Sequence, residues 1–193
     1  MPRFEYGLML LFLGADICIT GSFYSALYFA VALLHEGGHL FCMRRHKLTR
    51  QSVRFVGFGI VIDEKAHLSY RTEMAVCLAG PLFNLILAAI CFVIYTITGG
   101  SFWQQGMYAN GFYALLNILP IAPLDGYKIV TDFIMLHAAY PLAIRIQKMI
   151  ICSGIALLCI GAATLICFEF YNFSLLFIML ALLFNEIIYL IRE

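Results

Sequence analysis

Long apolar stretches constrain this chain more than any other feature. A membrane-crossing helix needs roughly 20 mainly apolar residues, and stretches close to that length lie near residues 5–20, 22–43, 73–98, 102–119, 146–168 and 172–191. Hydrophobic residues make up 63% of the chain and charged residues only 12%, which excludes an ordinary soluble domain. We therefore expect an all-α polytopic membrane protein with six transmembrane helices.

The first apolar stretch could be mistaken for a signal peptide. Asp16 interrupts it and no small-x-small cleavage site follows, so we interpret residues 1–20 as a retained helix. No linker, repeat or low-complexity tract divides the chain. We expect a single membrane-embedded domain over residues 1–193, with a catalytic core at about 22–138 and additional helices at 1–20 and 146–191.

The basic residues predict the direction of the spans. If the N-terminus is cytoplasmic, all twelve Lys and Arg residues fall in cytoplasmic segments, as the positive-inside rule requires. We therefore expect both termini in the cytoplasm. The net charge of +1 and the lack of a basic patch interleaved with aromatics give no sign of a nucleic-acid partner, and none is expected. The basic residues are Arg3, Arg44, Arg45, Lys47, Arg50, Arg54, Lys65, Arg71, Lys128, Arg145, Lys148 and Arg192.

The second apolar stretch contains an HExxH motif, His35-Glu36-Gly37-Gly38-His39. Residues i and i+4 share one face of a helix, so both imidazoles can address one metal ion while Glu36 flanks it as general base. Neutral imidazoles suit Zn²⁺, which would activate a water molecule for attack. A pair of packing histidines is the alternative, but ionisable groups inside a span are costly and usually functional.

A catalytic zinc site usually needs a third protein ligand. The extended motif HExxHxxGxxH is absent, since Cys42 and Arg45 stand where its glycine and last histidine would be. Glu64 and Glu73 are alternatives in or beside a basic loop. Asp125 is the better candidate, because it follows two prolines that break the fourth span, and irregular backbone at membrane depth is tolerated where it lines a wet cavity.

The depth of the candidate ligands agrees with this choice. His35 and His39 precede Arg44 by nine and five residues, or roughly 13 and 7 Å along a helix. Asp125 precedes Lys128 by three residues at the inner end of its span. The expected topology therefore places all three ligands toward the cytoplasmic side.

Three separated signatures resemble the site-2 protease family of intramembrane zinc metalloproteases, peptidase family M50. They are HEGGH at 35–39, AGPLFN at 79–84 and NILPIAPLDG at 117–126. The resemblance implies His35, His39 and Asp125 as ligands of one catalytic Zn²⁺, with Glu36 as catalytic base. It also implies a three-span core with the site inside the membrane.

Six spans with cytoplasmic termini resemble the compact, sporulation-type bacterial branch of that family. The resemblance implies a bacterial cytoplasmic membrane, but substrate and regulation cannot be carried over from this branch. We expect only the general partners of such a protease, namely a transmembrane or membrane-associated pro-protein as substrate and a regulatory membrane protein. The chain departs from the branch, whose members often carry a C-terminal CBS domain, because Glu193 follows directly after the sixth span at 172–191. A CBS or PDZ domain is therefore not expected.

A β-like stretch at 52–62 lies between the second and third spans. Its residues Gly57, Phe58 and Gly59 resemble the GxG of the family's membrane-associated β-loop, so we expect a short membrane-associated β-hairpin there. A free strand edge could pair with an unwound substrate by β-addition. An interfacial hairpin without a substrate role is the alternative.

Four further residues are predicted to contact substrate. Asn117, Pro120 and Pro123 could hold the substrate backbone near the zinc, although Asn117 could instead cap or bridge helices. Asn84 is open to the same two interpretations. We interpret other polar groups within or beside the spans as packing or interfacial residues, namely Asp16, Asp132, His137, Asn185 and Glu186.

The function expected from these residues is regulated intramembrane proteolysis by a zinc metalloendopeptidase. A catalytically silent, zinc-holding membrane binding or chaperone protein on the same scaffold is the alternative. A metal transporter is a third hypothesis, but transporters usually carry polar groups along the whole path and often show repeats. In this chain the candidate ligands gather at one end of the predicted path through the bilayer.

Overall fold

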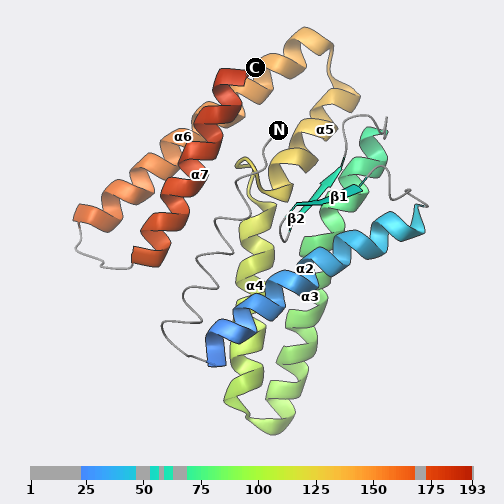
Figure 1. Ribbon diagram of the computed structural model, residues 1–193, viewed down its shortest axis with the longest axis vertical. Helices are drawn as coiled ribbons and strands as arrows, with labels where there is room; N and C mark the ends of the chain where they lie inside the picture. The colour runs from blue at the N-terminus through green and yellow to red at the C-terminus, as the bar shows by residue number, and fades with distance from the viewer. Residues whose placement is uncertain (1–22, 47–52, 57–58, 63–68, 168–172, 193) are drawn as a thin grey trace. The chain divides into compact units, whose positions relative to one another are not determined.

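The computed structural model describes residues 23–46, 53–56, 59–62, 69–167 and 173–192 (Figure 1). These residues form six helices and two strands. The chain divides into two compact units, Met1–Ile118 and Leu119–Glu193, which are considered in turn. The first predicted span and the residues Gly57 and Phe58 lie outside the described residues.

The first unit contains the three helices α2 (Phe23–Arg45), α3 (Tyr70–Thr98) and α4 (Ser101–Ile118), which all contact one another. Their bounds agree closely with the second, third and fourth apolar stretches. The prolines after residue 118 end α4 as expected, because proline disfavours helical backbone in the residue before it and cannot donate to the helix ladder.

Two backbone signals set the ends of α3. The hydroxyl oxygen of Ser69 caps its N-terminus by accepting from the Thr72 amide at 3.3 Å. Gly99 closes its C-terminus with a left-handed φ of 66°, and its amide donates to the Tyr95 carbonyl at 2.8 Å. The sharp turn at this glycine lets α4 begin at Ser101, two residues later, and pack against α3.

Two short antiparallel strands lie between α2 and α3 in the sequence, β1 (Val53–Val56) and β2 (Gly59–Ile62). Val53 pairs with Ile62, and Val56 pairs with Gly59. The two residues that join the strands lie outside the described residues. The strands therefore agree with the predicted β-like stretch, while its connection and its association with a membrane stay predictions.

The second unit contains α5 (Asp125–His137), α6 (Tyr140–Cys167) and α7 (Phe173–Arg192). Helix α6 contacts both α5 and α7. The core of this unit is a cluster of Ala122, Tyr127 and Ile151, which joins the segment before α5 to α6. The Tyr127 hydroxyl extends this packing by accepting a hydrogen bond of 3.0 Å from Gln147 Nε2 on α6.

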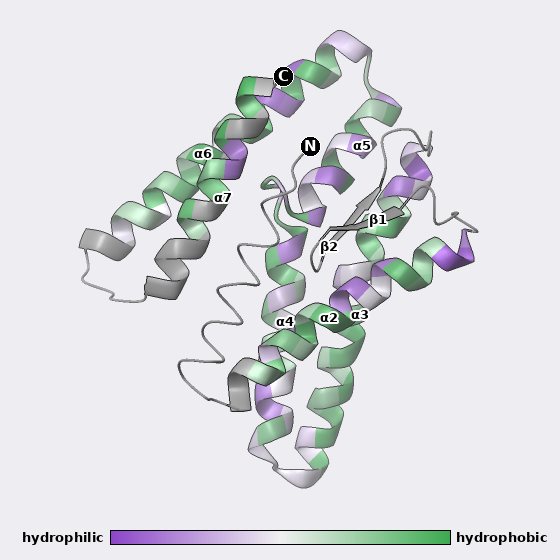
Figure 2. Cartoon of the chain, in the orientation of Figure 1, coloured by the Kyte–Doolittle hydropathy of each residue, from purple (hydrophilic) through white to green (hydrophobic). Residues whose placement is uncertain are grey.

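Within the described part of the chain, three helices are long and apolar enough to cross a membrane, over Ala26–Arg45, Tyr70–Thr98 and Tyr140–Thr164. Figure 2, which colours the chain by hydropathy, shows much of these helices in green, the colour of hydrophobic residues. On α3, large apolar side chains are exposed that would be costly in water and suit lipid, among them Leu82, Ile86, Phe92 and Ile97. These helices indicate an integral membrane protein, and the six-span count and its orientation stay predictions.

Candidate metal centre

The HExxH motif lies within α2, away from both helix ends. His35 and His39 are both buried, and their ring centroids are 4.8 Å apart with the ring planes nearly perpendicular, at 83°. The α-helical spacing of four residues brings the two rings to one face, as the sequence predicted. A second ring restrains His35, because Tyr113 of α4 contacts it edge-on with a centroid distance of 5.0 Å.

The ring of His39 is oriented by a hydrogen bond to α3. Its Nδ1 lies 2.8 Å from the backbone carbonyl oxygen of Val76. A carbonyl only accepts, so Nδ1 carries the proton and Nε2 keeps the lone pair that a metal requires. This contact selects the tautomer that suits metal binding.

The Nε2 atoms of both histidines lie over Gly80 of α3. A methyl group at Gly80 would come within 2.7 Å of His35 Nε2 and would also overlap His39 Nε2. The missing side chain therefore lets α3 approach both imidazoles more closely than any other residue would allow. Two buried imidazoles this close together supply the kind of nitrogen donors that Zn²⁺ takes in proteins.

Asp125 is the first residue of α5 in the second unit. A carboxylate in the first turn of a helix is stabilised by the amide groups and the positive end of the helix dipole. Leu124, the residue before it, has an extended backbone, so the chain turns into the helix at this carboxylate. Asp125 thus lies at the start of a helix, whereas the prolines before it predict only an irregular segment.

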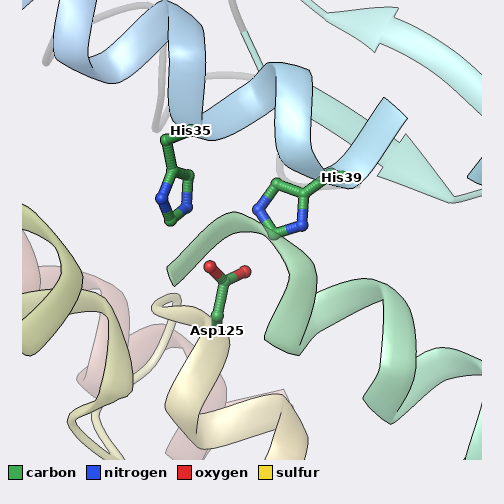
Figure 3. Close-up of side chains that lie close together, drawn as sticks. All are labelled: His35, His39 and Asp125. Atoms are coloured by element: carbon green, nitrogen blue, oxygen red, sulfur yellow. The ribbon is translucent and has the colours of Figure 1, made fainter. Parts of the chain in front are cut away.

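His35, His39 and Asp125 make up a group that could hold a metal ion (Figure 3). One ligand atom from each residue lies within 4.8 Å of the others. Two imidazoles and one carboxylate are a common ligand set for catalytic zinc. Glu36 follows His35 directly on α2 and is half-buried.

The predicted substrate-binding residues have varied surroundings. Asn117 is buried and its Nδ2 donates to the Tyr113 carbonyl of its own helix at 2.9 Å. Asn84 is fully buried, and its Nδ2 donates to the Val31 carbonyl of α2 at 3.5 Å, so it bridges α2 and α3. Pro120 is exposed and Pro123, which follows a cis peptide bond, is half-buried. A role in substrate binding stays a prediction for these four residues.

The β-loop residues are described only in part. Gly59 opens β2, whereas Gly57 and Phe58 lie outside the described residues. Their predicted contact with substrate stays a prediction.

Sequence reasoning missed two residues that shape the histidine pair. Gly80 belongs to the AGPLFN signature, but nothing in the sequence says that it lies under the imidazoles. Tyr113 lies four residues before Asn117, on the same face of α4. That spacing places Tyr113 near a predicted substrate-binding residue, but it does not predict the contact with His35.

The chain is similar to two proteins of Methanocaldococcus jannaschii. It is 37% identical over 81 residues to one named "Putative zinc metalloprotease", a match over 39% of this chain and 42% of that protein. The match thus spans less than half of that relative's length. No family model matches the chain.

The second similarity is to a solved structure, the site-2 protease of Methanocaldococcus jannaschii. The TM-score is 0.59 at 20% sequence identity, over 93% of this chain and 84% of that one. Similarity at this level of identity concerns the fold alone. The chain therefore has the fold of a site-2 protease.

Proposed function

We propose that this protein is an intramembrane zinc metalloendopeptidase of the site-2 protease family. The observation that carries the proposal is the grouping of His35, His39 and Asp125 beside the HExxH glutamate. The local similarity to a protein named as a zinc metalloprotease and the shared fold support it. The three residues would hold one Zn²⁺.

A bound Zn²⁺ would supply Lewis acidity, which polarises a peptide carbonyl and lowers the pKa of water. Glu36 is the general base, which accepts a proton from the attacking water and then donates it to the leaving amine. His39 keeps its orientation through Val76, and His35 through Tyr113. These residues are thus held in place before a substrate arrives.

The substrate is a transmembrane protein or a membrane-associated pro-protein. The long apolar helices support a site within the bilayer, and the basic residues support an orientation with both termini and the site toward the cytoplasm. The β1–β2 pair would present a strand edge, including Gly59, to an unwound substrate. Asn117, Asn84, Pro120 and Pro123 would contact substrate near the zinc.

The six-span, sporulation-type bacterial branch is the part of the family that we propose for this chain. Its place would be a bacterial cytoplasmic membrane, and a regulatory membrane protein would be a further partner. Six apolar stretches and a distribution of basic residues that predicts cytoplasmic termini support this assignment.

The test is cleavage of candidate membrane substrates by co-expressed parent and variant proteins, together with metal analysis of the purified proteins. We expect about one zinc per chain in the parent and in Glu36→Gln, because the three ligands remain. Cleavage should be lost in Glu36→Gln and in His35→Ala, and His35→Ala should also lose zinc. Gly37→Ala is the matched control, because a methyl group there meets nothing within 4 Å.

Two results would contradict the proposal in different ways. Cleavage by Glu36→Gln at the parent rate would remove Glu36 from its catalytic role. Zinc binding without cleavage of any membrane substrate would favour the alternative, a zinc-holding binding or chaperone protein.

A further inference from the structure

The segment that leads into α5 depends on a hydrogen bond from outside itself. Within this segment the Ile121 amide donates to Leu119 and the Leu124 amide donates to Ile121, both at 2.8 Å. Ala122 is fully buried, so its amide must find an acceptor or carry a desolvation cost. That acceptor comes from a distant part of the sequence.

The acceptor is the carboxyl group of Glu186 on α7. Its Oε1 lies 2.7 Å from the Ala122 nitrogen, although 64 residues separate the two along the chain. Glu186 is fully buried, and among the described residues its other oxygen, Oε2, accepts no hydrogen bond. A carboxyl group inside a predicted span is costly, and such groups are usually retained for function.

A glycine on α6 makes room for this contact. A methyl group at Gly154 would lie 2.7 Å from Glu186 Oε1 and 3.8 Å from Ile121 Cγ1. Gly154 thus faces both the Glu186 carboxyl and the segment before α5, which that carboxyl binds through Ala122. All these residues belong to the second unit, in which α6 contacts α7 (Figure 1).

We propose that Glu186 is a positioning residue, which tethers Ala122 and thereby sets where α5 begins and where Asp125 stands. Only Pro123 and Leu124 separate Ala122 from Asp125. The Tyr127 amide of α5 also donates to the Leu124 carbonyl at 3.1 Å, which joins the tethered segment to the helix. A shift of the tethered segment would therefore be passed to the aspartate. The inference rests on the proposed role of Asp125 as a zinc ligand.

The first measurement is amide hydrogen exchange of the 119–126 segment in the full chain, with metal chelated. Glu186→Leu removes the acceptor, so exchange there should rise about tenfold or more, as the loss of a buried hydrogen bond to a carboxylate predicts. Glu186→Gln keeps a side-chain oxygen acceptor and should exchange like the parent. Exchange in α3 serves as the measure of correct folding.

A pair of glycine variants on α6 provides a matched test without changing Glu186. Gly154→Ala would push the carboxyl away and should also raise exchange at 119–126. Gly161→Ala places its methyl group against the terminal methyl of Met179, which can move, and should leave that segment unchanged. If Glu186→Leu does not fold, this pair of variants still tests whether the Glu186 carboxyl protects the 119–126 segment from exchange.

The second measurement is zinc affinity at matched thermal stability. We expect Glu186→Leu to bind zinc about tenfold more weakly than the parent, because groups that orient a ligand typically contribute this much. Glu186→Gln should restore the affinity.

The possible results distinguish a failure of the inference about Glu186 from a failure of the proposed protease function. Unchanged exchange at 119–126 in Glu186→Leu and Gly154→Ala would overturn the inference. Raised exchange with parent-like zinc affinity would overturn the positioning of Asp125 alone. A parent protein that binds no zinc would overturn the proposed function and, with it, the positioning of a ligand, while exchange would still report on the tether itself.

Discussion

Gly80 of α3 lies directly against the imidazole of His39 on α2, and a single added methyl group would overlap its Nε2 atom. The same methyl would press on His35. Helix α3 therefore contributes to the candidate metal centre through backbone and through the absence of a side chain. Its other contribution is the Val76 carbonyl, which orients the His39 ring.

Gly80→Ala should weaken zinc binding by about tenfold or more, because both candidate nitrogens must move to accommodate the methyl group. Alanine in a helix is otherwise favoured over glycine by roughly 1 kcal/mol, so helix propensity cannot explain a loss. Competition titration against a zinc chelator gives the affinity. Gly111→Ala on α4 is the control, since a methyl there meets nothing within 4 Å. Parent-like affinity in Gly80→Ala would contradict the geometry.

The two glycines of the HEGGH motif should respond in opposite ways to alanine. A methyl at Gly38 would lie 2.7 Å from the Ala79 carbonyl oxygen and 2.8 Å from Phe83 Cβ, whereas one at Gly37 meets nothing. We expect Gly38→Ala to destabilise the protein by about 1–3 kcal/mol through overpacking of α2 against α3. Gly37→Ala should be neutral or stabilising by up to roughly 1 kcal/mol. Thermal unfolding in detergent measures both, and equal stability of the two variants would contradict this close approach.

Zinc should stabilise the folded protein. A ligand that binds only the native state adds about 2.7 kcal/mol at a free concentration 100 times its Kd. We expect chelation to lower the Tm of the parent and zinc to restore it. In Asp125→Ala the same additions should shift the Tm far less, because one of three proposed ligands is missing. A shift as large in Asp125→Ala as in the parent would remove this residue from the ligand set.

The orientation of the helices can be tested with inserted reporters. The turn at Gly99 is expected outside and the connection at Ala138, between α5 and α6, inside. Alkaline phosphatase inserted after Gly99 should be active, because it folds only outside the cytoplasm, and the same insertion after Ala138 should be inactive. The reversed pattern would contradict the predicted direction of every span.

Helix positions were largely predictable because a bilayer fixes the length of the apolar stretches. Five such stretches match α2, α3, α4, α6 and α7. Helix α5 was not predicted as a helix. It has only 13 residues and carries charged groups, including Lys128 and Asp132, which form an ion pair at 3.1 Å. A criterion of apolar length does not detect so short and polar a helix.

The histidine pair was predictable because four residues of helix bring two side chains to one face. Asp125 was inferred from the proline-rich segment before it and from depth. The contacts of Gly80 and Tyr113 with the imidazoles were not predictable, because they depend on how α3 and α4 pack against α2. The same holds for Glu186, which had been interpreted as a packing or interfacial group and which bonds to Ala122 across 64 residues.

The hydrogen bond between Ala122 and Glu186 can form only late in the synthesis of the chain. A ribosome releases residue 122 well before residue 186, so the segment before Asp125 is made without its acceptor. The segment can gain that hydrogen bond only after α7, which carries Glu186, has been made and has packed against α6. The newly made chain would thus fix Asp125, the proposed zinc ligand, late in its biogenesis, and a chain truncated before α7 would lack this support of the segment before Asp125.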